Sequence, residues 1–249
     1  MDIYLLAGTF LIIAALYSSV GFGGGSSYIA LLLIAGLQVQ EVRMLALSCN
    51  IIVVALSVYR FQIAGHIPWK RVWPILAMSI PLAFLGGTIE LSSETFKLVA
   101  ALMLIVAAVI MLKDSKKIQY HKSLSSPALA SLSGGIGFVS GVVGIGGGIF
   151  LSPVLHLIRW QSVRTISVTA SVFILANSIA GIAGQVLSGS TLPTTNLLLL
   201  GGAVAVGALV GSHFNVAILS ARHIKLLTAI LVGFVGVRIL LLYLTGSSI

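Results

Sequence analysis

Two glycine clusters inside apolar runs are the residues of this chain whose type and spacing point most directly to chemistry. Gly21-Phe-Gly-Gly-Gly25 recurs as Gly144-Ile-Gly-Gly-Gly148. Glycine carries no side chain, so a ligand can approach its peptide groups closely. A helix that begins just after such a cluster has unpaired N–H groups at the positive end of its dipole. Each cluster therefore predicts a backbone site suited to an anion.

The two clusters belong to a duplication that covers the whole chain. Val42-Arg43, for example, returns as Val163-Arg164, and the offset between the copies is about 121 to 128 residues in a chain of 249. A duplicated membrane unit with a break in each copy is typical of transporters whose site lies between the halves. We therefore divide the chain into a first repeat (1–112), a basic linker (113–126) and a second repeat (127–249).

Composition indicates a membrane protein. Hydrophobic residues make up 58% of the sequence and charged residues 8%, whereas a soluble domain carries about 25% charged residues. The net charge of +9 would suggest a nucleic-acid partner for a soluble protein. Here the basic residues separate apolar runs, so we expect them to set the orientation of the spans and expect no nucleic-acid binding.

The apolar runs predict an all-α polytopic membrane protein with about ten helical segments. The predicted segments are 3–20, 26–37, 44–59, 72–89 and 95–112 in the first repeat, and 127–143, 149–158, 165–184, 197–215 and 226–244 in the second. The second segment of each repeat is too short for the roughly 20 residues that a span needs. We predict that the first two segments form a short broken hairpin and that three full spans follow.

The distribution of basic residues decides between two topologies. If the first two segments formed one broken span, the halves would be parallel, and the basic loop residues would divide seven to six between the two sides. If they form a hairpin, the halves are inverted and the division is eleven to two, with Arg43 and Lys97 outside. Because basic loops stay inside, we predict inverted repeats, a cytoplasmic linker and both termini outside.

We expect the anion to contact the two breaks and neutral donors beside them. The predicted substrate-binding residues are Gly23, Gly24, Gly25, Ser26, Asn50, Gly146, Gly147, Gly148 and Ser171. Asn50 and Ser171 occupy matching positions in the third segments of the two repeats. Two other interpretations stay open. The glycines permit close helix packing, and polar residues such as Asn50 and Asn177 join helices through hydrogen bonds.

The sequence leaves the coupling of transport open. The acidic residues, all in predicted loops or at span ends, are Asp2, Glu41, Glu90, Glu94 and Asp114. We therefore expect no buried carboxylate that relays protons. His156 and His213 lie near second-repeat segments and titrate close to neutrality. A coupling histidine, a substrate that carries its own proton and uncoupled transport all remain possible. The role of Cys49 is equally open, and nothing in the pattern predicts a cofactor or metal.

Over essentially its full length the chain resembles the TauE/SafE sulfite exporter family of anion permeases. The resemblance rests on Gly21–Gly25 and on Gly144-Ile-Gly-Gly-Gly-Ile-Phe-Leu-Ser-Pro153, which has the GxGGG pattern of that family and its downstream proline. The first copy departs from the pattern with Ala30 at the place of the proline. The second reads Thr169-Ala-Ser171 where the family commonly has Gly-Thr-Ser. The resemblance implies transport of sulfite, a sulfonate, thiosulfate or another sulfur-containing anion.

We therefore expect a secondary permease for a small sulfur-containing anion, in several passes through the inner cell membrane. A membrane-embedded enzyme is an alternative, disfavoured because no His, Asp or Glu pair has metal-binding or acid–base spacing. An uncoupled anion channel is a second alternative. A receptor or scaffold is disfavoured because almost no chain lies outside the apolar runs. The expected partners are the anion and the lipid bilayer, and a homodimer stays open.

Overall fold

The computed structural model describes residues 2–19, 21–112, 126–158, 160–213 and 221–245. These residues form ten helices and no strand. The helices are α1 (Ile3–Ser18), α2 (Gly25–Ile34), α3 (Val39–Ile63), α4 (Trp69–Thr88), α5 (Ser93–Leu112), α6 (Ser126–Val143), α7 (Gly148–Leu157), α8 (Val163–Leu187), α9 (Thr194–His213) and α10 (Ala221–Thr245). The prediction of an all-helical chain with ten segments is confirmed. Residues 113–125 of the predicted linker and residues 214–220 lie outside the described part.

Helix lengths separate spanning from short helices. Five helices of the described residues are long and apolar enough to cross a membrane, namely α3, α4, α5, α8 and α9. Helices α2 and α7 have only 10 residues each, as the two short predicted segments require. Helices α3 and α8 have 25 residues each and extend past the predicted 44–59 and 165–184. The polar residues at their ends are therefore helical, where the sequence indicated loops.

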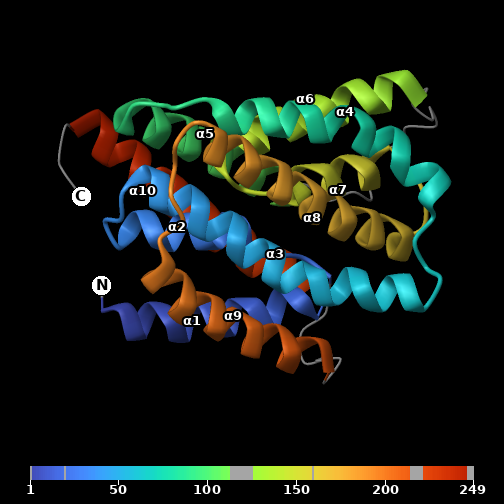
Figure 1. Ribbon diagram of the computed structural model, residues 1–249, viewed down its shortest axis with the longest axis horizontal. Coiled ribbons are helices and arrows are strands. Elements are labelled where there is room, and N and C mark those ends of the chain that lie inside the picture. Colours follow the sequence, from blue (N-terminus) through green and yellow to red (C-terminus); the bar gives the residue numbers. More distant parts are fainter. Residues whose placement is uncertain (1, 20, 113–125, 159, 214–220, 246–249) are drawn as a thin grey trace.

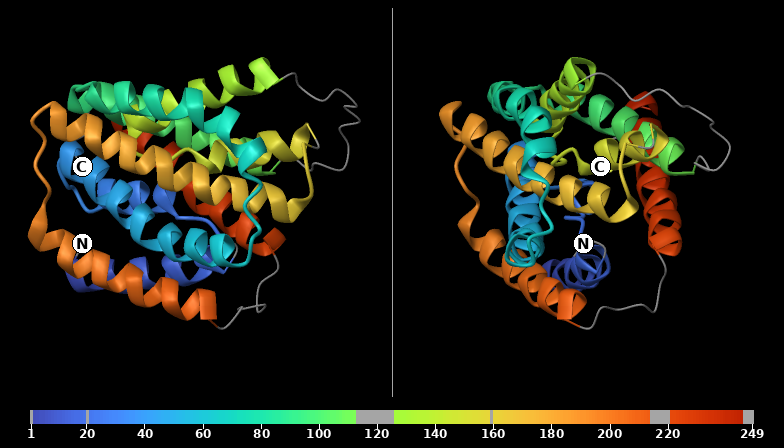
Figure 2. Two further views of the ribbon diagram at one scale, coloured as in Figure 1. Left: turned by 45° about the vertical axis from the view of Figure 1, so that its right-hand side comes forward. Right: turned by 90° about the vertical axis from the view of Figure 1, so that its right-hand side faces the viewer.

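Helices of one repeat pack on helices of the other, in matching pairs (Figures 1 and 2). Helix α1 packs on α9, and its counterpart α6 packs on α4. Helix α2 contacts α10, and its counterpart α7 contacts α5. Helices α3 and α8 contact each other and are 67% buried over their most apolar stretch, against 33–39% for α4, α5 and α9. The two repeats thus interlock around α3 and α8, and neither forms a separate body.

Matching helices run in opposite directions. In Figure 1, α3 runs from left to right, whereas α8, its counterpart, runs from right to left, and the start of α1 and the end of α10 both lie at the left. Helices α4 and α9 are opposed in the same way. This arrangement places Arg43 and Arg164, near the starts of α3 and α8, toward opposite ends of the bundle.

Glycine permits the closest helix contacts of the bundle. A Cβ at Gly86 in α4 would overlap the backbone oxygen of Phe138 in α6, and one at Gly141 would overlap that of Ala83. Gly211 in α9 approaches the oxygen of Ala15 in α1 in the same manner. Small residues let membrane helices approach each other closely. Glycine therefore permits close packing at these helix pairs, which lie outside the two breaks.

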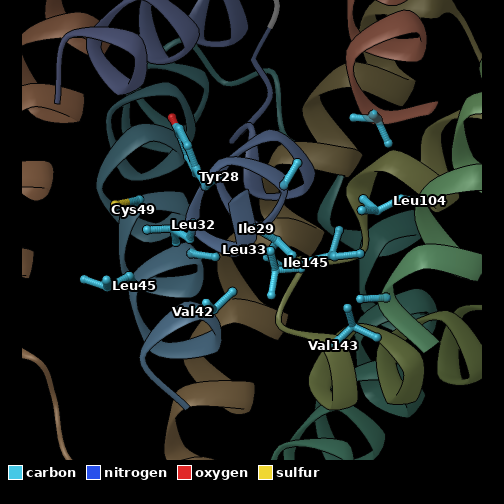
Figure 3. Close-up of a cluster of buried hydrophobic side chains, with 14 of the residues drawn as sticks. Tyr28, Ile29, Leu32, Leu33, Val42, Leu45, Cys49, Leu104, Val143 and Ile145 are labelled. Carbon is cyan, nitrogen blue, oxygen red and sulfur yellow. The ribbon is translucent and has the colours of Figure 1, made fainter. Parts of the chain in front are cut away.

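The largest apolar cluster encloses the short helix α2. Figure 3 shows Ile29, Leu32 and Leu33 of α2 beside residues of α3, including Cys49, with Ile145 of the second break close to Ile29. Cys49 is buried, and its thiol is free. It therefore fits the interpretation of a small apolar core residue. Burial of α2 on all sides fixes the position of the break that precedes it.

Candidate functional site

Each glycine break ends in a backbone conformation that only glycine adopts easily. Gly24 has φ +86° and Gly147 has φ +76°, both in the left-handed region. A side chain in this region meets the following carbonyl oxygen, at a cost of roughly 1–2 kcal/mol. Helices α2 and α7 begin at the next residues, Gly25 and Gly148, one position earlier than predicted. The prediction of a short helix directly after each break is confirmed.

The starts of α2 and α7 lie inside the protein without side-chain caps. All residues from 23 to 27 and from 144 to 149 are buried. In the described residues, no side chain hydrogen-bonds to cap either helix at Gly24 or Gly147. The first N–H groups of a helix have no partner within the helix, and they carry the positive end of its dipole. Two buried helix starts of this kind favour negative charge between them.

Asn50 joins the two breaks. Its side chain is 0% exposed, and Nδ2 donates a hydrogen bond to the backbone oxygen of Ile145, 2.9 Å away. Asn50 lies in α3 of the first repeat, whereas Ile145 lies in the break of the second. Oδ1 of Asn50 has no partner among the described residues. A buried amide normally uses both of its polar atoms, and Oδ1 of Asn50 keeps its capacity to accept a hydrogen bond.

Three of the predicted glycines face Asn50. A Cβ at Gly23 would overlap Oδ1 of Asn50, and a Cβ at Gly25 would overlap Nδ2 and the oxygen of Ile145. At Gly146, a Cβ would lie 2.6 Å from Nδ2 of Asn50. The two breaks therefore meet at one amide side chain, and each of these three positions has room only for hydrogen.

The other three predicted glycines face apolar side chains. Gly24 lies against Tyr28, Gly147 lies against Phe173, and Gly148 lies against Ile174. The structure therefore brings half of the predicted glycines to Asn50 and places the other half against Tyr28, Phe173 and Ile174.

The predicted serines have different surroundings. Oγ of Ser171 lies within hydrogen-bonding distance of two backbone oxygens that share its single proton, that of Gly21 and that of Ser167, the latter 3.0 Å away. Ser171 thus holds the first break from α8, as Asn50 holds the second break from α3. Ser26 is buried at 3% exposure. The neighbouring Ser27 lies 3.1 Å from the hydroxyl of Tyr17.

Ser178 is a residue of this region that the sequence did not single out. It is completely buried, its Oγ has no partner among the described residues, and a Cβ at Gly146 would lie 3.0 Å from it. It follows Ser171 by seven residues, which puts the two on one face of α8. The seven-residue spacing was the feature of the sequence that could have indicated Ser178. Asn177 donates from Nδ2 to the oxygen of Phe173, 2.8 Å away, within its own helix.

The prediction that Arg43 lies in a loop between spans is wrong. Arg43 is 3% exposed and lies inside α3. Its guanidinium donates to the backbone oxygens of Ile89 (3.0 Å), Gly87 (3.2 Å) and Gly141 (3.1 Å). These oxygens lie at the ends of α4 and α6, where helix dipoles favour a cation. The hydrogen-bond acceptors of the guanidinium are backbone oxygens, and Glu90 adds a favourable charge interaction. Backbone oxygens leave no signal in the sequence that would have indicated burial.

The described residues contain no group of three His, Cys, Asp or Glu that could hold a metal ion. Nδ1 of His156 donates to the backbone oxygen of Ser152, 2.7 Å away, within α7. The side chain of His213 lies outside the described part. The site is therefore made of backbone groups, an amide and hydroxyls.

Comparison with known proteins places the chain in a family. The model of the sulfite exporter TauE/SafE family matches residues 5–239, so the chain belongs to this family, as the resemblance indicated. A probable membrane transporter protein, y4hK, of Sinorhizobium fredii is 31% identical over 243 residues, which cover 94% of this chain and 97% of that protein. The probable membrane transporter protein MJ0441 of Methanocaldococcus jannaschii is 25% identical over 200 residues, covering 75% of this chain and 73% of that protein. No solved structure matches.

The family and the two relatives are membrane transporters, which agrees with the long apolar helices of the structure. The chain is a multi-pass membrane protein, and it is a membrane transporter.

Proposed function

We propose that this transporter carries a small sulfur-containing anion and binds it where the two glycine breaks meet at Asn50. The observation that carries the proposal is the position of Asn50, which is completely buried and lies against Gly23 and Gly25 of one break and Gly146 of the other. A substrate at this point would contact both repeats at once. The family name supplies the chemical class, since the matching family is that of the sulfite exporters TauE/SafE.

The chemistry of the site suits an oxyanion. Helices α2 and α7 both start here, so their positive dipole ends point to one region. Donors are the N–H groups of the two helix starts, with Oγ of Ser178 and Nδ2 of Asn50 beside them. The free Oδ1 of Asn50 can accept a hydrogen bond from a protonated anion. A site of this kind holds one negative charge without a fixed counter-charge.

The helix arrangement supports inverted repeats. Helix α1 of the first repeat packs on α9 of the second, and in the same way α6 of the second repeat packs on α4 of the first. Helices α3 and α8 run in opposite directions. In transporters built in this way, the site near the middle is opened to one side and then to the other by motion of one unit against its partner. With the basic linker in the cytoplasm, both termini lie outside the inner membrane.

Flux through purified protein tests the proposal. Protein reconstituted in liposomes is loaded with radiolabelled sulfite, and release is compared with that from protein-free liposomes. We expect saturable flux that unlabelled sulfite, thiosulfate or a small sulfonate inhibits and that choline does not. Absence of flux for all three anion classes, from protein that elutes as a single species in detergent, would overturn the assignment to sulfur-containing anions.

A further inference from the structure

A polar stripe with the same spacing runs along α3 and along α8. The stripe residues stand at steps of seven, which places them on one helix face, and they are Arg43, Asn50 and Ser57 in α3 and Arg164, Ser171 and Ser178 in α8. The two sets match in the duplication at a constant offset of 121 positions. A step of seven residues spans about 10.5 Å of helix. Each stripe therefore begins with an arginine about 10.5 Å from the polar residue that holds a break.

The two arginines have opposite environments. Arg43 is 3% exposed and donates to backbone oxygens at the ends of α4 and α6. Arg164 is exposed, and its Nη2 lies 3.1 Å from Nε2 of the exposed His66. Because α3 and α8 run in opposite directions, the buried arginine lies toward one end of the bundle and the exposed arginine toward the other.

The backbone oxygen that matches the acceptor of Arg43 binds a different arginine at the other end of the bundle. The offset of 125 that relates α4 to α9 makes Ser212 the match of Gly87. The oxygen of Gly87 accepts from Arg43, whereas the oxygen of Ser212 accepts from Arg60, 2.5 Å away. Arg43 binds the end of α4, but Arg164, which matches Arg43, does not bind the matching end of α9. Arg60 binds that end instead.

The break glycines show the same asymmetry. A Cβ at Gly144 would lie 3.1 Å from Cα of Arg43, so the second break lies against the start of α3. A Cβ at Gly21, the matching residue, would lie 3.0 Å from Oγ of Ser171, two helical turns beyond Arg164 in α8. The second break therefore lies against the residue at the start of the stripe in α3, whereas the first break lies against a residue in the middle of the stripe in α8.

We infer that Arg43 and Arg164 are paired gate residues at the two ends of the anion path. In this structure Arg43 acts as a latch that ties α3 to the ends of α4 and α6 and closes its end. Arg164 is released and presents a cation to an anion that approaches the other end. In the opposite state the two arginines exchange these roles. This inference rests on the proposed anion transport, which supplies the charge that the released arginine attracts.

The chemistry of guanidinium suits both roles. It presents five donors, which can bind several backbone oxygens or, when released, an oxyanion through paired charged hydrogen bonds. Among the residues that the structure describes, Arg43 makes hydrogen bonds only with backbone oxygens, and its Nε has no partner. Its hydrogen bonds are therefore ones that helix ends can make and release, and the carboxylate of Glu90, two residues past the end of α4, adds a favourable charge interaction.

Labelling of a buried cysteine tests the latch without any substrate. Ser140 in α6 is completely buried next to Gly141, which accepts from Arg43, and a Cβ at Gly147 would lie 3.2 Å from its Cβ. Ser140→Cys, in a Cys49→Ala background, is exposed to a water-soluble maleimide in detergent. Addition of Arg43→Gln should raise the labelling rate about tenfold or more, because loss of charge-assisted hydrogen bonds shifts the closed state by at least that factor.

Two variants make the result specific. Lys70→Gln removes a positive charge from an exposed residue and should leave the labelling of Ser140→Cys unchanged. Arg43→Lys keeps the charge with fewer donors and should give an intermediate rate, which guards against a general loss of structure in Arg43→Gln. Unchanged labelling in Arg43→Gln, or an equal rise in Lys70→Gln, would overturn the latch.

Flux completes the test. Arg164→Gln should raise the KM for anion entry from its own side at least about tenfold, because charged hydrogen bonds of the released arginine are lost. An unchanged KM would overturn the capture role of Arg164. If the wild-type protein moves no sulfur-containing anion while the Ser140→Cys variants label as predicted, the proposed function is contradicted and the latch still holds.

Discussion

Nδ2 of Asn50 in α3 lies 2.9 Å from the backbone oxygen of Ile145 and donates a hydrogen bond to it. This bond connects the first repeat to the break of the second at a buried point. Ser171, the counterpart of Asn50, makes the reciprocal contact by donating to the oxygen of Gly21 in the first break. Each repeat therefore holds the break of the other with a polar side chain, so that a ligand bound at either break acts on both repeats.

The first prediction concerns the affinity of the site. Asn50→Ala should weaken the apparent affinity for sulfite roughly ten- to a hundredfold, because a hydrogen bond to a charged group is worth about 1.5–3 kcal/mol. Concentration dependence of flux in proteoliposomes measures the change. Lys70→Gln removes an exposed charge and should leave the affinity nearly unchanged. A normal affinity for Asn50→Ala together with loss of binding in Lys70→Gln would show that a cationic site had been missed.

The second prediction concerns the left-handed residues. Gly24→Val and Gly147→Val should abolish flux, since valine in this conformation is strained by roughly 1–2 kcal/mol or more and its side chain would press on Tyr28 or Phe173. Both proteins should still reach the membrane at near-normal levels, as immunoblots of membrane fractions would report. Transport by Gly24→Val at the wild-type rate would indicate that the break serves helix packing alone.

The third prediction concerns orientation. In a Cys49→Ala background, a cysteine at Ser115 should react with an impermeant maleimide only from the cytoplasmic face, because the basic linker stays inside. A cysteine at Ser190, in the uncharged loop after α8, should react only from outside. Labelling of both positions from the same side would contradict inverted repeats with external termini.

The fourth prediction concerns stability. Gly86→Leu should lower the free energy of unfolding by about 1–3 kcal/mol through overpacking, because a side chain there overlaps the backbone oxygen of Phe138 in α6. Thermal unfolding in detergent measures the loss. Gly202→Leu in α9 is the matched control, since nothing lies within 4 Å of a Cβ at that position. Equal melting temperatures for the two variants would refute the close α4–α6 contact.

The sequence was sufficient to predict the breaks and the helices that follow them. The glycine clusters and the short apolar segments after them predicted the starts of α2 and α7 to within one residue. The reason is local, because a glycine in the left-handed region can end one helix and begin another without help from distant residues.

The contacts of the site required the structure. Gly23 and Gly24 are neighbours of the same type, yet only Gly23 faces Asn50, and that difference arises from the packing of α2 against α3. Arg43 was assigned to a loop because the predicted apolar segment begins at residue 44, directly after it. Its partners are backbone oxygens of α4 and α6, and backbone groups carry no signature in a sequence.

The most direct test of the account is sulfite flux through Gly25→Ala. Gly25 has no left-handed conformation to lose, and a methyl group there would overlap both Nδ2 of Asn50 and the oxygen of Ile145. Gly202→Ala adds the same methyl group in open space. We predict that Gly25→Ala protein in liposomes loses saturable sulfite flux while Gly202→Ala retains the wild-type rate. Equal flux through the two variants would contradict a binding site at the meeting point of the breaks.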